Sequence, residues 1–155
     1  MSRRDQIKLT DDEQRELLDD ERVVTVASHG PRGWPHLMPL WYVVRSGRIW
    51  IWTYAKSQKV KNLERDPRAT LLVETGHEYS ELRGVQIEAD AHLHRDLDTV
   101  FEFAKELTVR YAEGSDSIEG DAAEALKAQA PKRVAIEFEP KRVATWDHRK
   151  LGGTY

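Results

Sequence analysis

The sequence predicts a mainly β (α+β) protein, an antiparallel barrel with peripheral helices. Six segments alternate apolar and polar residues with the period of two that a half-buried strand requires. Short turns join several of them as hairpins, and helical segments do not alternate regularly with strands. A doubly wound parallel sheet is therefore disfavoured. The chain contains no linker or internal repeat, so residues 1–155 are expected to form one domain.

The first third of the chain predicts a helix followed by three strands. Thr10 and Glu13 have the spacing of a capping box, which places a helix from there to about Leu18. Pro39 cannot donate a hydrogen bond to a neighbouring strand, so its segment belongs at a sheet edge or a bulge. The three strands, separated by Gly-containing turns, are expected at Val23–Ser28, Pro35–Val44 and Arg48–Tyr54.

The remainder predicts three strands and three helices. Ser57 is a candidate N-cap, and Asp66-Pro67 ends the helix that follows it. Apolar residues at helical spacing predict two later helices, of which the second ends at Pro131. These elements are expected at Arg68–Thr75, Arg83–His94 and Arg133–Glu139 for the strands, and at Leu97–Ala112 and Ala122–Ala130 for the helices.

The start of the Ser57 helix is unusually basic. Lys56 and Lys59 flank the cap, where cations oppose the helix dipole at a cost of roughly 0.3–1 kcal/mol each. Trp50 and Trp52 precede them on one face of the adjoining strand. A helix N-terminus, a hydroxyl, two ammonium groups and aromatic rings suit an aromatic ligand that carries a phosphate. The alternative interpretation is a solvated, lysine-rich surface helix.

Composition excludes several classes of protein. The net charge of −3 and pI near 6.1 do not indicate a nucleic-acid partner. The absence of cysteine removes disulfides, cysteine nucleophiles and Cys-based metal sites. No signal-peptide core or membrane-length apolar run is present, so a cytoplasmic location without membrane contact is expected. Neither GxGxxG, Walker A nor GxSxG occurs. His92 and His94 share a strand face but lack a third ligand, so no metal site is expected.

A set of short motifs resembles one family. In order, they are Gly33-Trp34-Pro35-His36, Pro39-Leu40-Trp41-Tyr42, Ile49–Thr53, Lys56–Lys59, Asn62–Arg68, Tyr79–Val85 and Trp146–Gly152. This set is similar to the split β-barrel flavin and deazaflavin oxidoreductases related to pyridoxamine 5′-phosphate oxidase. Within these, it most resembles the actinobacterial B group of coenzyme F420-dependent reductases. The resemblance implies a six- to seven-stranded antiparallel split β-barrel with peripheral helices, and a homodimer with cofactor at the subunit interface.

The resemblance also implies which residues bind the cofactor. They are Pro39, Leu40, Trp41, Trp52 and Thr53 at the ring, Lys56, Ser57 and Lys59 at the phosphate, and Arg83, Trp146 and Arg149 as residues that reach the anionic tail or the partner's cofactor. Trp52 is expected to border the ring, and Trp50 to pack.

The function implied is hydride transfer between coenzyme F420 and an unsaturated small-molecule substrate. One alternative is an FMN-binding oxidase or diaphorase of the same fold, and another is a cofactor carrier without its own turnover. Pyridoxamine phosphate oxidation is disfavoured, because no basic cluster for a substrate phosphate is found beyond the cofactor site. No side chain stands out as a proton donor among Tyr42, Tyr54, His36 and His77, so the catalytic residue stays unassigned.

Overall fold

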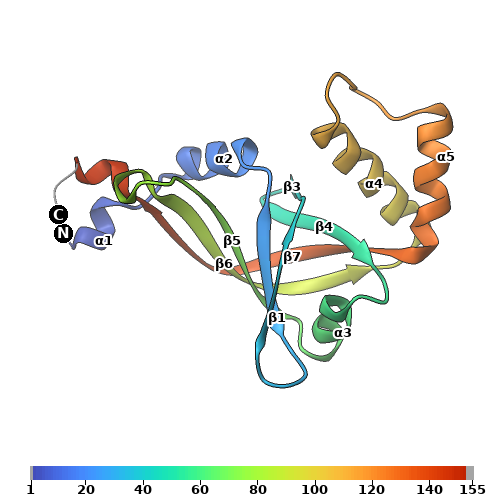
Figure 1. Ribbon diagram of the computed structural model, residues 1–155, viewed down its shortest axis with the longest axis horizontal. Coiled ribbons are helices and arrows are strands. Elements are labelled where there is room, and N and C mark those ends of the chain that lie inside the picture. The colour runs from blue at the N-terminus through green and yellow to red at the C-terminus, as the bar shows by residue number, and fades with distance from the viewer. Residues whose placement is uncertain (1, 153–155) are drawn as a thin grey trace.

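The computed structural model describes residues 2–152, which are arranged around one strongly curved sheet (Figure 1). Seven strands lie in the order β2-β1-β5-β6-β7-β4-β3, and every neighbouring pair is antiparallel. The sheet curls into a half-barrel, which confirms the predicted split-barrel fold. The strands are β1 Val24–His29, β2 Pro35–Leu40, β3 Val43–Arg45, β4 Arg48–Tyr54, β5 Arg68–Thr75, β6 Arg83–His94 and β7 Arg133–Asp147.

Five α-helices within residues 2–152 lie at the periphery of this sheet. They are α1 Arg3–Gln6, α2 Asp11–Asp20, α3 Gln58–Arg65, α4 Leu97–Tyr111 and α5 Gly120–Gln129, with short 3-10 helices at Tyr79–Glu81, Ala130–Lys132 and His148–Leu151. The predicted capping box is confirmed, because Thr10 accepts from the Glu13 amide and Glu13 accepts from the Thr10 amide. None of the described helices is long and apolar enough to cross a membrane.

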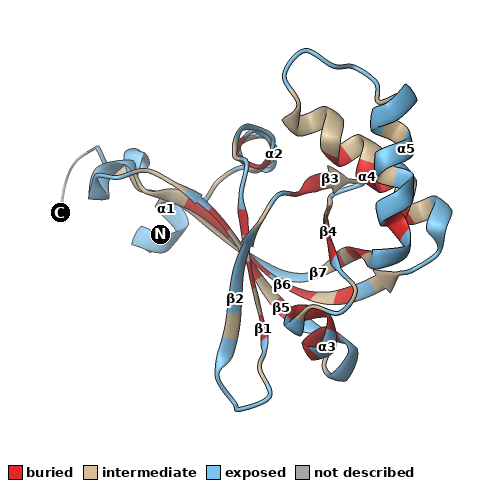
Figure 2. Cartoon of the chain, turned by 45° about the vertical axis from the view of Figure 1, so that its right-hand side comes forward, coloured by how far each residue is buried: buried red, intermediate tan, exposed pale blue. Residues whose placement is uncertain are grey.

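The apolar faces of these elements form two cores (Figure 2). The first fills the half-barrel with alternate residues of β4 to β7, among them Ile51, Val85 and Ile136, which are fully buried. The second lies between α4 and the outer face of β3, β4 and β7, where Phe103 and Leu107 of α4 pack near Trp50 and Trp52. The two tryptophans of β4 therefore face the helical layer rather than the barrel interior.

The prediction of one continuous strand over Pro35–Val44 is wrong. β2 ends at Leu40 and pairs with β1, whereas β3 begins at Val43 and pairs with β4 at the opposite edge of the sheet. Trp41 and Tyr42 form a crossing segment between these edges. The break occurs at Tyr42, whose ring is fully buried in the core. Burial of this ring requires the chain to leave the β2 edge of the sheet. The expectation that Pro39 lies on an edge strand is confirmed.

The last strand is also longer than the predicted Arg133–Glu139. β7 continues to Asp147, because Pro140 is accommodated at a bulge instead of ending the strand. The pairing register shifts there, so that Glu88 lies opposite Arg142 while Ala89 lies opposite Pro140. The continuation carries Trp146, which lies directly opposite Gly84 of β6.

Gly84→Ala is expected to destabilise the fold. An added Cβ would lie 2.5 Å from the Trp146 ring, so the indole or the strand must move. Overpacking of this kind costs about 1–3 kcal/mol of unfolding free energy. Equilibrium denaturation of the variant measures the loss, and an unchanged midpoint would contradict the close packing of Trp146 on β6.

Candidate functional site

A pocket of about 580 Å³ lies at the open side of the half-barrel. β3 pairs only with residues 48–50 of β4, so the rest of that β4 edge has no neighbouring strand. Side chains from five elements and two connecting segments surround the space beside it. The lining residues are Val23, Pro39, Leu40, Trp41, Trp52, Thr53, Tyr54, Lys59, Leu107 and Arg133.

Six of the eleven predicted cofactor-binding residues meet in this pocket. They are Pro39, Leu40, Trp41, Trp52, Thr53 and Lys59. The predicted cofactor-binding set did not include Val23, Leu107, Arg133 or Tyr54, of which Tyr54 was considered only as a proton donor. In the sequence, Leu107 has the spacing of an ordinary buried position of a helix. Arg133 is simply a polar residue at the start of a predicted strand. Neither carries a local motif, so their place in the pocket depends on tertiary packing.

Two indole rings contribute aromatic surface to the pocket. Trp41 is 56% exposed, and its ring stacks on Tyr111 with the centroids 4.4 Å apart and the planes within 11°. Trp52 is overlaid by the Arg133 guanidinium, 4.7 Å from its ring centroid. Trp50 does not line the pocket; it stacks on His94 and packs near Phe103. The two neighbouring tryptophans of β4 thus have different surroundings.

Lys59 is a buried cation. Its side chain comes from the first turn of α3, and the residue is only 7% exposed. Nζ donates to Thr53 Oγ1 at 2.9 Å, and no carboxylate of residues 2–152 lies within 4.0 Å of it. Burial, with the nearby charge of Arg133, lowers the pKa of Lys59. An unpaired, partly desolvated ammonium group of this kind is suited to an anionic ligand.

Arg133 is the second cation of the pocket. Its guanidinium lies over the rings of Trp52 and Tyr54, 4.7 and 3.6 Å from their centroids. Nη2 donates to Gln129 Oε1 at 3.3 Å, while Nε is buried and has no hydrogen-bond partner within the described chain. Residues 2–152 offer it no ion pair. Lys59 and Arg133 therefore place two positive charges beside the aromatic surface without a compensating carboxylate.

The predicted phosphate residues Lys56 and Ser57 lie next to the pocket without lining it. Ser57 is the N-cap residue of α3, as expected, but its hydroxyl makes no capping bond. Ser57 Oγ is buried, and the described residues provide no partner for it. Lys56 borders an adjoining hollow of about 450 Å³ together with Lys132, and Tyr54 is shared between the two spaces.

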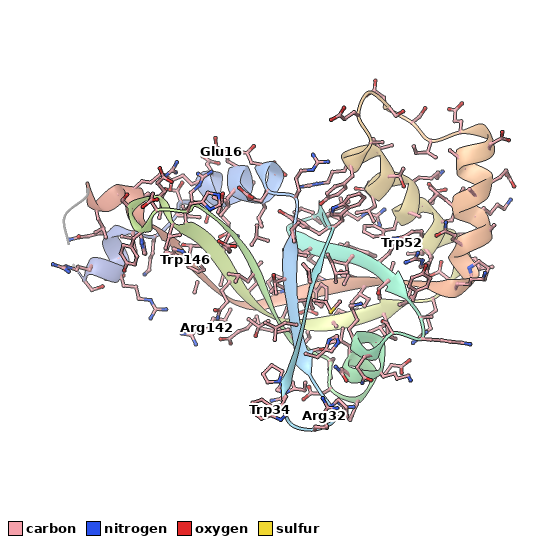
Figure 3. All side chains as sticks on the ribbon, in the orientation of Figure 1. Glu16, Arg32, Trp34, Trp52, Arg142 and Trp146 are labelled. Atoms are coloured by element: carbon pink, nitrogen blue, oxygen red, sulfur yellow. The ribbon has the colours of Figure 1, made fainter. Side chains whose placement is uncertain are left out.

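The predicted tail residues lie elsewhere in the same chain. Figure 3 shows Trp146 and Trp52 toward opposite ends of the molecule. Arg83 pairs with Asp147 in the β6–β7 ladder, one step from Trp146. Arg149 makes a two-point ion pair with Asp147, with Nε to Oδ1 at 2.9 Å and Nη2 to Oδ2 at 2.7 Å, and this contact lowers the pKa of Asp147. A single chain does not bring Arg83, Trp146 or Arg149 to the pocket.

Two groups considered from the sequence have structural partners. His92 and His94 bind Glu139 and Glu137 at 2.8 and 2.9 Å, so both imidazoles are engaged across the β6–β7 pair. The Tyr42 hydroxyl donates to backbone carbonyls at the end of α2, and burial raises the pKa of Tyr42. Tyr42 is thus a structural residue rather than a proton donor.

These features define the class of protein: a split β-barrel protein with a pocket that combines aromatic rings and cations. Residues 10–147 match the sequence model of the family described as pyridoxamine 5′-phosphate oxidase. The chain belongs to this family. No match was found among curated proteins.

Solved structures share the fold of this chain. A conserved hypothetical protein of Mycobacterium tuberculosis, Rv2991, is 34% identical, with a TM-score of 0.88 over 100% of this chain and 95% of the other. An F420 reductase is 18% identical, with a TM-score of 0.63 over 84% of this chain and 94% of the other. A FAD-binding protein of Mesorhizobium loti is 16% identical, with a TM-score of 0.63 over 89% and 94% of the two chains. The last two similarities show a shared fold.

Lys59→Met tests whether the buried ammonium is held at a cost to stability. In the folded protein the pKa of Lys59 lies below its ordinary value of 10.5. Between the folded and the ordinary pKa, the unfolded chain therefore binds more protons than the folded one. Stability of the wild type should therefore gain, relative to the variant, as pH rises through this interval. Below it, we expect ligand-free Lys59→Met to be the more stable protein. Chemical denaturation across the alkaline range measures both effects, and a variant that is less stable at every pH would contradict them.

Proposed function

We propose that this protein is a coenzyme F420-dependent reductase acting on an unsaturated small molecule. The observation that carries the proposal is the pair of uncompensated cations, Lys59 and Arg133, beside the rings of Trp41 and Trp52. A flat conjugated ring joined to a phosphate has the same two features in complementary form. The buried, unsatisfied Ser57 hydroxyl and Arg133 Nε add further unused hydrogen-bonding capacity for an anionic group.

The residues present fit such a cofactor. Pro39, Leu40, Trp41, Trp52 and Thr53 would hold its ring, and Lys59, Arg133, Ser57 and Lys56 would hold its phosphate. When bound in the reduced form, a deazaflavin supplies hydride for an electron-poor double bond. The chain's own part is to bind and orient the reactants and to exclude water. The hydrogen bond from Lys59 to Thr53 fixes the ammonium group in place before any ligand binds.

We also propose that the site is completed in a homodimer. Arg83, Trp146 and Arg149 lie far from the pocket of their own chain, and a second copy could supply them to it. Exposed apolar side chains on and beside the β1–β2 hairpin support a self-association surface. They are Trp34 at 75%, Leu37 at 56% and Met38 at 39% exposure.

An FMN-binding oxidase or diaphorase is the alternative that the pocket favours next. FMN also combines a planar ring with a phosphate, so the same cations and indoles would serve it. The similarity of fold to a FAD-binding protein supports this alternative. A carrier without turnover is the third candidate, because the Tyr42 hydroxyl is committed to backbone carbonyls and the proton donor of a reduction stays unassigned.

Titration of the purified protein with F420 and with FMN tests the proposal. We expect F420 to bind more tightly, followed by oxidation of reduced F420 in the presence of quinones, enones or tetrapyrroles. Tight binding of FMN without binding of F420 would replace the proposal by its flavin alternative. Binding of F420 without reaction with any of these acceptors would favour the carrier.

Lys59→Ala should weaken cofactor binding by about 10- to 100-fold, which corresponds to the loss of a charge-assisted hydrogen bond. The difference from wild type should shrink as salt concentration rises, because ions screen the contact. Lys61→Ala is the matched control, since Lys61 is an exposed lysine of the same helix that does not line the pocket. Equal effects of the two substitutions would mean that Lys59 acts only through the overall charge of the protein and makes no specific contact with the cofactor.

A further inference from the structure

The crossing segment Trp41-Tyr42 lacks the ladder partners of a strand. β2 ends before it and β3 begins after it, on opposite edges of the sheet. Backbone groups in such a segment need other hydrogen-bond partners. One side chain supplies them for Tyr42: the hydroxyl of Tyr111, at the end of α4.

Tyr111 makes three polar contacts with the backbone around the crossing. Its oxygen accepts from the Tyr42 amide at 3.0 Å. Its hydroxyl donates toward the carbonyl oxygens of Tyr42 and Arg22, at 2.9 and 2.8 Å. The hydroxyl thus fixes both backbone polar groups of the residue that follows Trp41, and ties them to the chain just before β1.

The ring of Tyr111 also covers Trp41. The two rings are nearly parallel with centroids 4.4 Å apart, and the Arg22 guanidinium lies 4.6 Å from the Tyr111 centroid. Trp41 remains 56% exposed and lines the ligand pocket. Tyr111 does not line the pocket itself. It is therefore placed behind a pocket residue, and holds it by ring stacking and through the adjoining backbone.

Arg110, the preceding residue, secures the same region from another side. Its Nη2 donates to the carbonyls of Leu18, Asp19 and Glu21 at the end of α2, at 2.9, 3.2 and 3.0 Å. The last turn of α2 contains no basic residue, so Arg110 supplies the cation that a helix C-terminus favours. The end of α4 is thereby anchored, and Tyr111 has a fixed base from which to act.

We propose that Tyr111 is a positioning residue that sets the orientation of the Trp41 ring as a wall of the pocket. A stacked, tethered indole keeps one orientation before a ligand arrives, which lowers the entropic cost of binding a planar ring. The role concerns any flat conjugated ligand. The affinity measurements below rest on the proposed function, whereas the spectroscopic measurement does not.

A double-mutant cycle between Trp41 and Tyr111 tests the proposal. Binding of F420 and of FMN is measured for Trp41→Ala, Tyr111→Leu and the double variant. We expect Tyr111→Leu to weaken binding of the preferred cofactor about tenfold, and the double variant to bind no more weakly than Trp41→Ala. Fully additive losses, or unchanged affinity in Tyr111→Leu, would overturn the proposal.

A second readout needs no ligand. The protein is labelled with 5-fluorotryptophan, and the Trp41 signal among the five indoles is assigned from Trp41→Phe. Tyr111→Leu should shift or broaden the Trp41 fluorine resonance while leaving that of Trp52 in place. An unchanged Trp41 resonance would overturn the proposal even if neither cofactor binds the wild type, so its failure and that of the proposed function are distinguishable.

Two further variants separate positioning from loss of stability. Tyr111→Phe keeps the ring stack and removes the hydroxyl, so it is the milder change and should perturb the Trp41 signal less than Tyr111→Leu. Phe101→Leu loosens the apolar packing of α4 ten residues earlier and is the matched control. If Phe101→Leu moves the Trp41 signal and the affinity as much as Tyr111→Leu does, the effect is general loosening and the positioning role is wrong.

Discussion

The structure depends on one constraint: consecutive segments of the chain form the two opposite edges of the same sheet. β2 and β3 are separated by two residues, yet five other strands lie between them in the sheet. The crossing at Trp41-Tyr42 must therefore span the open side of the half-barrel. Tyr42 makes this possible with a fully buried ring and a hydroxyl that donates to the end of α2. The pocket lies where it does because this single crossing leaves the end of the β4 edge without a neighbouring strand.

Near this crossing, the protein holds two partly buried positive charges, although burial disfavours the charged form of a side chain. Lys59 and Arg133 are two like charges at one pocket, and neither has a carboxylate partner in residues 2–152. Their surroundings compensate only in part, through Thr53, Gln129 and the faces of two aromatic rings. By contrast, Arg149 is fully matched by Asp147. The stability of the two cores offsets the cost of holding these two charges at the pocket, which is the usual relation between a scaffold and a binding site.

Local pattern was sufficient for strands whose alternation is regular. β4, β5 and β6 begin and end where the period of two predicts, because each is flanked by turn residues or by a helix. The pattern failed at Pro35–Val44 and at the end of β7, where pairing with distant strands decides the outcome. The resemblance located six pocket residues, but Arg133 was missed because a strand-initial arginine has no distinctive local signal. Arg83, Trp146 and Arg149 come together at the Asp147 end of β7, away from the pocket, so their predicted role in cofactor binding stays a prediction.

The pocket residues are far apart in the sequence, and this affects how the protein folds during its synthesis. The wall residues Trp41, Lys59 and Arg133 come from early, middle and late parts of the chain, and Tyr111 braces the first of them from a fourth place. Contacts between such distant segments form slowly, since long loops must close first. During synthesis, the hairpins can pair locally. The pocket cannot form until the segment after Pro131 has emerged from the ribosome. Ligand binding therefore requires that the chain has been synthesised and folded at least through Arg133, and a polypeptide truncated before this residue would lack the second cation of the site.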